Sequence, residues 1–183
     1  MAEPSGSGIG MGGKEADLSE TEGSTNDEAR RLSDLEFAMI VGINGFWRWV
    51  VHCAEAAGAR GLGALDVLVL HAVNLRARDK KLADICLVLN VEDSHTVAYA
   101  LKKLEDQGYV AHRQAGRERV YAATSDGDEL CDRYHSVRRE ALLSSLDADA
   151  VDFARLDEAT KVLNRMSRYY SHASRAAMIK PRA

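Results

Sequence analysis

The stretch that decides the fold is residues 92–127, EDSHTVAYALKKLEDQGYVAHRQAGRERVYAATSDG. Its first half has the spacing of an amphipathic helix that ends at Gly108, since glycine readily adopts the left-handed conformation that follows a helix. Its second half contains two β-prone runs, residues 109–113 and 119–123, with QAGRE between them as a turn. The stretch therefore predicts a helix followed directly by a β-hairpin.

This helix is predicted to have two opposite faces. Val97, Leu101 and Leu104 cluster on one side, where they suit a protein core. The other side displays or flanks polar and aromatic side chains: Ser94, His95, Thr96, Tyr99, Lys102 and Lys103. Such groups donate hydrogen bonds to phosphates and base edges of DNA. A polar face that only contacts solvent is the alternative.

A shorter helix is predicted directly before it. Asp79 is placed to cap that helix, an apolar stripe follows, and Asn90 ends it. Asp93 or Glu92 then begins the longer helix, and Thr124 or Ser125 can cap a further helix after the hairpin. Two short helices this close together have helix-turn-helix spacing. The hairpin that follows carries Arg117 at its tip and Arg119 just beyond. This order indicates a winged helix-turn-helix, in which the helix enters the major groove of DNA and the hairpin arginine reaches the minor groove.

Residues 65–130 resemble the MarR family of bacterial transcription regulators. The resemblance is carried by LDVLVL, by KLADICLVLNVEDSHTVAYALKKLEDQGYVAHR, by the wing, and by ATSDGDEL. It implies that Ser94, His95, Thr96 and Tyr99 face the major groove, that Lys102 and Lys103 lie near phosphates, and that Arg117 acts at the wing tip. The sequence departs from the family pattern in two places: GRER at 116–119 replaces the usual Asp-x-Arg, and Tyr99 stands where a basic residue is common.

The resemblance also implies a homodimer on a pseudo-palindromic operator in double-stranded DNA, without a cofactor. A small-molecule effector would bind in a cleft between the first helix, the second helix and the winged domain. Aromatic rings there could stack on a phenolic ligand, and the candidates are Phe46, Trp47, Trp49 and His71. Packing of these rings in the core or at a subunit interface is the alternative.

The predicted fold class is mainly α with a small β-hairpin wing. We expect a disordered acidic, glycine-rich tail at 1–27, an N-terminal dimerisation helix at 28–62, the winged helix-turn-helix domain at 63–124, and C-terminal dimerisation helices at 125–183. The first helix carries two apolar stripes, which is more apolar surface than a helix resting on one core needs. The surplus indicates a subunit interface, although central burial in a monomer would also explain it.

The overall charge gives no reason to expect a polyanionic partner, since the net charge is −4 and the pI about 5.9. Charge is nevertheless uneven, and residues 151–183 contain seven bases and three acids. That basic end is interpreted as a solvated surface, with contacts to phosphate or to the acidic N-terminal tail as alternatives. A winged-helix module that binds protein rather than DNA also remains open.

Other chemistry has little support in the sequence. Gly8, Gly10 and Gly13 have GxGxxG spacing but neither the strand nor the helix that a dinucleotide site requires. A zinc site at Asp128, Cys131, Asp132 and His135, or a redox pair of His52 and Cys53, is a minor alternative. No catalytic set, metal site or membrane span is predicted. Three scattered cysteines and no apolar leader predict a reducing, cytoplasmic compartment.

Overall fold

The computed structural model describes residues 13–146 and 152–179. The order of its elements is α1 (Gly13–Ala56), α2 (Ala64–Asn74), β1 (Lys80–Lys81), α3 (Leu82–Leu89), α4 (Ser94–Asp106), β2 (Val110–Ala115), β3 (Glu118–Ala123), α5 (Ser125–Val137) and α6 (Phe153–Ile179). Short helical turns follow α2 (Leu75–Ala77) and α5 (Arg138–Leu142 and Leu143–Ser145). The predicted fold class, mainly helical with a small wing, is confirmed.

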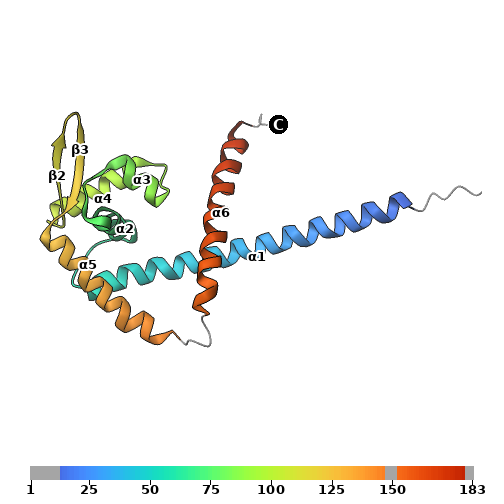
Figure 1. The fold of residues 1–183 in the computed structure, drawn as a ribbon, viewed down its shortest axis with the longest axis horizontal. Coiled ribbons are helices and arrows are strands. Elements are labelled where there is room, and N and C mark those ends of the chain that lie inside the picture. The colour runs from blue at the N-terminus through green and yellow to red at the C-terminus, as the bar shows by residue number, and fades with distance from the viewer. Residues whose placement is uncertain (1–12, 147–151, 180–183) are drawn as a thin grey trace, which may run out of the picture.

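Figure 1 shows how these elements are arranged. The helices α2, α3 and α4 and the sheet gather at one end of the molecule, above the C-terminal end of α1. The helix α5 leads away from this winged domain, and α6 returns to cross α1 near its middle. In the described segments, no helix is both long and apolar enough to cross a bilayer.

The sheet has three antiparallel strands in the order β1-β3-β2. Its hairpin pairs Val110 with Ala123 and Ala115 with Glu118, so both strands run further toward the tip than the sequence predicts. The strand β1, which the sequence analysis missed, pairs Lys80 with Tyr121 and Lys81 with Val120. Two residues are too few to show the alternation by which a strand is recognised.

A single hydrophobic core joins the winged domain to the last turns of α1 and to α5. Its largest fully buried side chains are Leu70, Ile85, Leu101, Leu104, Val50, Val69, Val73 and Val97. The core-facing side of α4 predicted above, Val97, Leu101 and Leu104, is therefore confirmed. Burial of these side chains fixes the rotation of α4 about its axis, and so determines which residues α4 displays.

Most of the predicted helix ends are also present. The Asp93 side chain caps α4 by accepting the His95 N–H at 2.9 Å, and Asn90 ends α3 in the left-handed conformation at φ 52°. Thr124 caps α5 through the Gly127 N–H at 3.1 Å. The prediction for Asp79 is wrong: α3 begins two residues later than expected, after Lys81. Asp79 pairs instead with Arg113 on the neighbouring sheet.

The structure differs from the prediction of a disordered tail over residues 13–27, which belong to α1. The physical reason is that a helix already formed from residue 28 onward extends without a second nucleation cost. Residues 1–12, the rest of that predicted tail, lie outside the described residues.

Candidate nucleic-acid interface

The outward side of α4 is the centre of the candidate interface. Ser94, His95, Thr96, Tyr99 and Lys102 are all exposed, and the Tyr99 side chain is 73% accessible. The Thr96 hydroxyl donates to the Asp93 carbonyl at 2.8 Å, so its proton is already used within the N-cap. Tyr99 adds an exposed phenol to this surface.

The two lysines of α4 have different surroundings. Lys102 is exposed and forms an ion pair with Asp106 one turn away, with Nζ 3.1 Å from Oδ1. Lys103 turns toward α2, where its Nζ lies 2.6 Å from Oδ2 of Asp66, whose side chain is only 10% accessible. The same carboxylate accepts the Gly63 N–H at 2.7 Å. Lys103 therefore bridges α4 to the start of α2 and lies apart from the displayed side of α4.

The wing supplies two arginines. Arg117 and Arg119 are exposed, and no ion pair of either with a described residue is present. Gly116 has φ +63°, a conformation that glycine adopts without strain and that allows a two-residue turn between the strands. The Gln114 side chain donates to the Gly116 carbonyl at 3.1 Å and so holds the tip. Sequence reasoning missed this role of Gln114.

The fold brings α4 and the wing together along two adjoining grooves. One groove, of about 770 Å³, is lined by Ser94 of α4, by α3 and by Arg119 and Tyr121 of β3. The other, of about 750 Å³, is lined by Lys102, His112 and the same two β3 residues. Arg119 thus lies beside α4 at both grooves, whereas Arg117 stands beyond them at the tip.

Acidic side chains neutralise several of the surrounding bases. Lys81 pairs with Glu118, Arg113 with Asp79, and His112 hydrogen-bonds Glu105. Together with the ion pairs of Lys102 and Lys103, these contacts give acidic partners to four of the nine lysines and arginines in residues 63–124. Most of these partners could not be predicted from the sequence; Lys81, for example, lies next to Glu118 only through the register of β1 in the sheet.

The four aromatic candidates for an effector site are not brought together. Phe46 lines a groove between α1 and α6, while His71 lines a cavity of about 10 Å³ among α2, α5 and the end of α1. The Trp47 side chain is 50% accessible, and Trp49 packs against the core. The structure therefore does not support one ligand cleft built from these rings.

The minor alternatives also lose support. Among the described residues, no group of three or more His, Cys, Asp or Glu is placed to hold a metal ion. Cys53 is buried and its thiol donates to the Tyr134 carbonyl at 3.5 Å, while His52 is exposed. Burial raises the pKa of the Cys53 thiol, which disfavours the reactive thiolate. A redox pair of His52 and Cys53 does not fit this arrangement.

Comparisons with known proteins agree with this geometry. Residues 62–127 match the family described as "Winged helix DNA-binding domain". No curated protein matches the chain. The chain is similar to the crystal structure of a MarR family transcription regulator, with 13% identity and a TM-score of 0.64 over 83% of this chain and 98% of that one.

Two further solved structures share the fold. The first is AbfR of Staphylococcus epidermidis, with 17% identity and a TM-score of 0.66 over 82% of this chain and 99% of that one. The second is BpsR of Bordetella bronchiseptica, with 17% identity and a TM-score of 0.53 over 71% of this chain and 98% of that one. Residues 62–127 thus match a winged helix DNA-binding domain, and the chain has the fold of MarR family transcription regulators.

Proposed function

We propose that this protein is a homodimeric, sequence-specific regulator of transcription that binds a pseudo-palindromic operator. The observation that carries the proposal is the juxtaposition of the exposed side of α4 with the two unpaired arginines of a wing, in a winged helix DNA-binding domain. Each subunit would place α4 in a major groove, with half-sites about one helical turn apart.

Base recognition would come from Ser94, His95 and Tyr99 at the exposed N-terminal half of α4. A hydroxyl or imidazole can hydrogen-bond base edges, and an aromatic ring can contact a thymine methyl group. Lys102 and Arg119 would contact phosphates beside that groove, and Arg117 would enter the neighbouring minor groove. We leave Lys103 out of this set because of its ion pair with Asp66.

A second copy of the chain is the proposed occupant of the apolar surface on α1 and α6. Phe37, Ile40 and Val41 of α1 are each more than half exposed, and Tyr169 and Met178 of α6 are more exposed than Ile40 and Val41. A groove of about 880 Å³ between these helices is lined by Leu35, Met39, Ile43, Phe46 and Leu163, among others. An apolar surface this continuous is more typical of a subunit interface than of a monomer.

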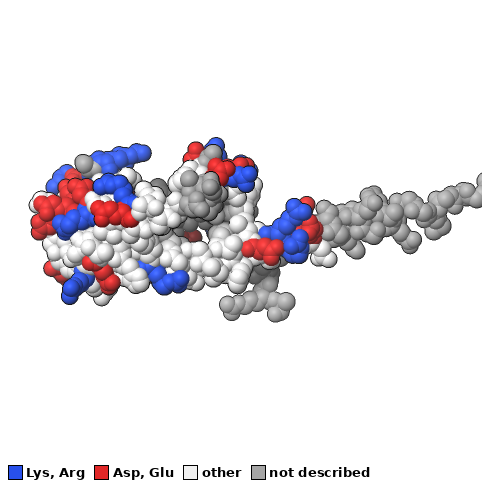
Figure 2. Space-filling view, turned by 90° about the horizontal axis from the view of Figure 1, so that it is seen from below, with Lys and Arg blue, Asp and Glu red and all other residues white. Residues whose placement is uncertain are grey.

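Figure 2 shows one face of this surface. Charged side chains gather at the winged-domain end, over α6, and on α1 next to the part drawn in grey. The stretch of α1 between the winged-domain end and the last of these groups is largely uncharged. The charge pattern therefore favours an apolar contact in the middle of α1.

Control by a small molecule is part of the proposal. The solved structure of BpsR is described in terms of regulation of its DNA binding by 6-hydroxynicotinic acid. For this chain the proposal is that an effector alters DNA affinity, at a site other than a cleft formed by the four aromatic candidates, which do not come together.

Selection of bound fragments from the source genome tests the regulator proposal, followed by titration of the selected duplex at several salt concentrations. Release of counterions from contacted phosphates makes the logarithm of the binding constant fall by about 0.9 per contact for each unit of log salt. A selected motif with two related half-sites and a steep salt dependence is expected. Sedimentation should give the mass of a dimer, and failure to enrich any motif would contradict the proposal.

A winged-helix module that binds another protein is the second candidate. The internal ion pairs favour it, because Lys81, Lys102, Lys103 and Arg113 all have acidic partners in the described structure. The salt titration separates the two candidates. Protein binding without any duplex shift at low salt would favour the interaction module.

A further inference from the structure

A row of basic side chains runs along one side of α6. Its members are spaced alternately four and three residues apart: Lys161, Arg165, Arg168, His172 and Arg175. This spacing places them within about 80° of one another on the helix, over a length of about 21 Å. We call these five residues the α6 basic row.

The α6 basic row is turned away from the surface by which α6 contacts its own chain. The contact residues are Tyr170, whose hydroxyl donates to Glu36 of α1 at 3.0 Å, and Ser167, whose hydroxyl oxygen accepts from Asn90 at 3.3 Å. Leu163 lies on this same contact side and lines the groove with α1. All five members of the row are exposed, in contrast to the half-buried Ser167 and Tyr170.

The row lacks acidic partners in the described structure. Among the described residues, the ion pair that involves α6 joins Arg155 to Asp152. This pair lies at the start of the helix, and Arg155 does not belong to the row. The two acids of α6, Asp157 and Glu158, both precede Lys161, so no acid interrupts the row. Four of the nine lysines and arginines of the winged domain have acidic partners, whereas no member of the α6 basic row has one among the described residues.

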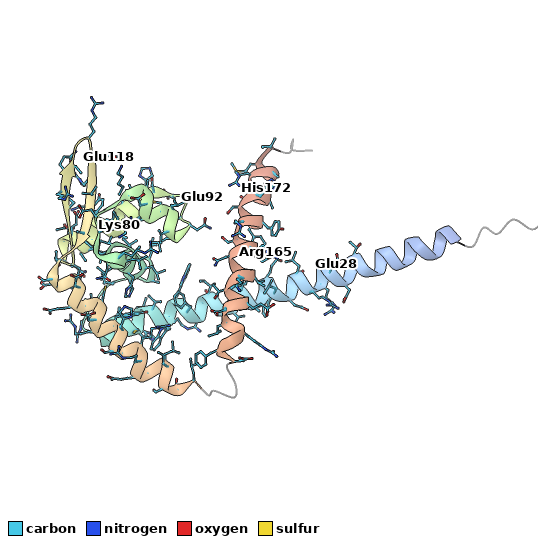
Figure 3. The ribbon with its side chains drawn as sticks, viewed as in Figure 1. Glu28, Lys80, Glu92, Glu118, Arg165 and His172 are labelled. Carbon is cyan, nitrogen blue, oxygen red and sulfur yellow. The ribbon has the colours of Figure 1, made fainter. Side chains whose placement is uncertain are left out.

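The helix that carries the row is joined to the DNA-reading part of the molecule by its opposite side. The bond from Asn90 to Ser167 joins α6 to the turn between α3 and α4, just before the Asp93 cap of α4. Figure 1 shows the C-terminal half of α6 rising on the same side of α1 as the winged domain. Figure 3 labels Arg165 near the crossing with α1 and His172 further toward the C-terminal end of that half.

We infer that the α6 basic row is a second DNA-binding surface, which contacts the phosphate backbone beside the segment read by α4. The inference rests on the proposed DNA binding. Regularly spaced cations without base-reading geometry add affinity and salt dependence and leave sequence preference unchanged. A row about 21 Å long reaches several phosphates, and two subunits double that number.

The test compares two full-length triple variants that lose the same charge. In the row variant, Arg165, Arg168 and Arg175 are replaced by Gln; in the control, Arg30, Arg31 and Arg155, which lie off the row in ion pairs, are replaced by Gln. Binding to the genome-selected duplex and to a mixed-sequence duplex of equal length is measured by fluorescence anisotropy at 50–200 mM salt, alongside Arg117→Ala. Sedimentation follows the oligomeric state.

The row variant is expected to bind both duplexes at least tenfold more weakly at low salt, with a salt slope lower by about 2 or more. Its ratio of specific to non-specific affinity, its circular dichroism and its mass should stay those of the parent protein, and the control should bind as the parent does. If the row variant binds DNA as the parent does while Arg117→Ala binds more weakly, this inference is overturned and the proposed DNA binding stands.

Two other results also count against the row. Loss of the dimer in the row variant would mean that the α6 basic row contacts the acidic part of α1 in a second copy and does not contact DNA. Absence of binding by the parent protein to either duplex would overturn both this inference and the proposed function.

Discussion

Lys103 of α4 forms an ion pair with Asp66 of α2, with 2.6 Å between Nζ and Oδ2. Asp66 is buried and also accepts the Gly63 N–H, so this carboxylate joins the start of α2 to the C-terminal half of α4. Removal of the ammonium group leaves a buried charge with one partner fewer. We therefore expect Lys103→Met to lower the free energy of unfolding by about 1–3 kcal/mol, as measured by urea denaturation.

Lys102→Met is the matched control for that variant. Lys102 carries the same charge at the neighbouring position, but its ion pair with Asp106 is exposed on both sides. Its loss should change stability by less than about 0.5 kcal/mol, yet weaken DNA binding because the ammonium faces the groove with Arg119. The reverse pattern, a stable Lys103→Met protein with weak DNA binding, would restore Lys103 to the contact set.

Arg117 and Tyr99 should differ in what they contribute to DNA binding. Arg117 stands at the tip without a described ion pair, so Arg117→Ala should weaken binding about fivefold or more, most strongly where the flanks are A·T-rich. Tyr99 projects from the middle of α4, and Tyr99→Ala should change the preferred base at one position of each half-site. Competition among point-mutated operators measures both effects, and an unchanged preference in Tyr99→Ala would mean that α4 presents another side to DNA.

The sequence predicted those parts of the site that depend on local spacing. The exposed and buried sides of α4 follow from its period, and the caps at Asp93, Asn90 and Thr124 follow from neighbours within three residues. The role of Lys103 could not be predicted from local spacing, because its partner Asp66 is 37 positions away and only the fold brings the two together. The strand β1 and the partner of Lys81 were missed for the same reason.

His71 should make stability depend on pH. Burial, and secondarily the nearby His135, lower the pKa of His71 to about 4, and its ring lies 4.6 Å from that of Tyr134. In the unfolded chain His71 takes up a proton near pH 6.5, whereas in the folded chain it does so only near pH 4. The free energy of unfolding therefore falls as the pH drops through this window. Because the ring is only partly buried, we expect a loss of about 1–2 kcal/mol.

Urea denaturation between pH 4 and 7.5 measures this effect. The His71→Gln variant should lose most of the pH dependence in that window, whereas His172→Gln on the exposed side of α6 should retain it. An equal pH dependence in His71→Gln and the parent protein would show that another group is responsible.

The three cysteines should differ in reactivity. Burial raises the pKa of the Cys131 thiol to about 12, with the nearby Asp128 and Asp132 adding to the effect, and burial also raises the pKa of Cys53. Cys86 is only half-buried and lines the groove beside α3. A thiol reagent at pH 8 should therefore modify one residue, Cys86, in the folded protein and all three in urea. Rapid modification of Cys53 in Cys86→Ser would revive the redox interpretation of His52 and Cys53.

Two glycine substitutions should have opposite effects on stability. A Cβ at Gly127 would overlap the carbonyl oxygen of Tyr109, where α5 begins against the hairpin, while a Cβ at Gly42 would meet nothing within 4 Å. The Tyr109 carbonyl is also fixed, because it accepts the Thr124 N–H at 3.1 Å. Gly127→Ala must therefore displace backbone, and we expect a loss of at least about 2 kcal/mol. Gly42→Ala lies within helix α1 and should add up to about 1 kcal/mol. Thermal denaturation of both variants decides the matter: a Gly127→Ala protein as stable as the parent would mean that the start of α5 packs less closely on the hairpin than described.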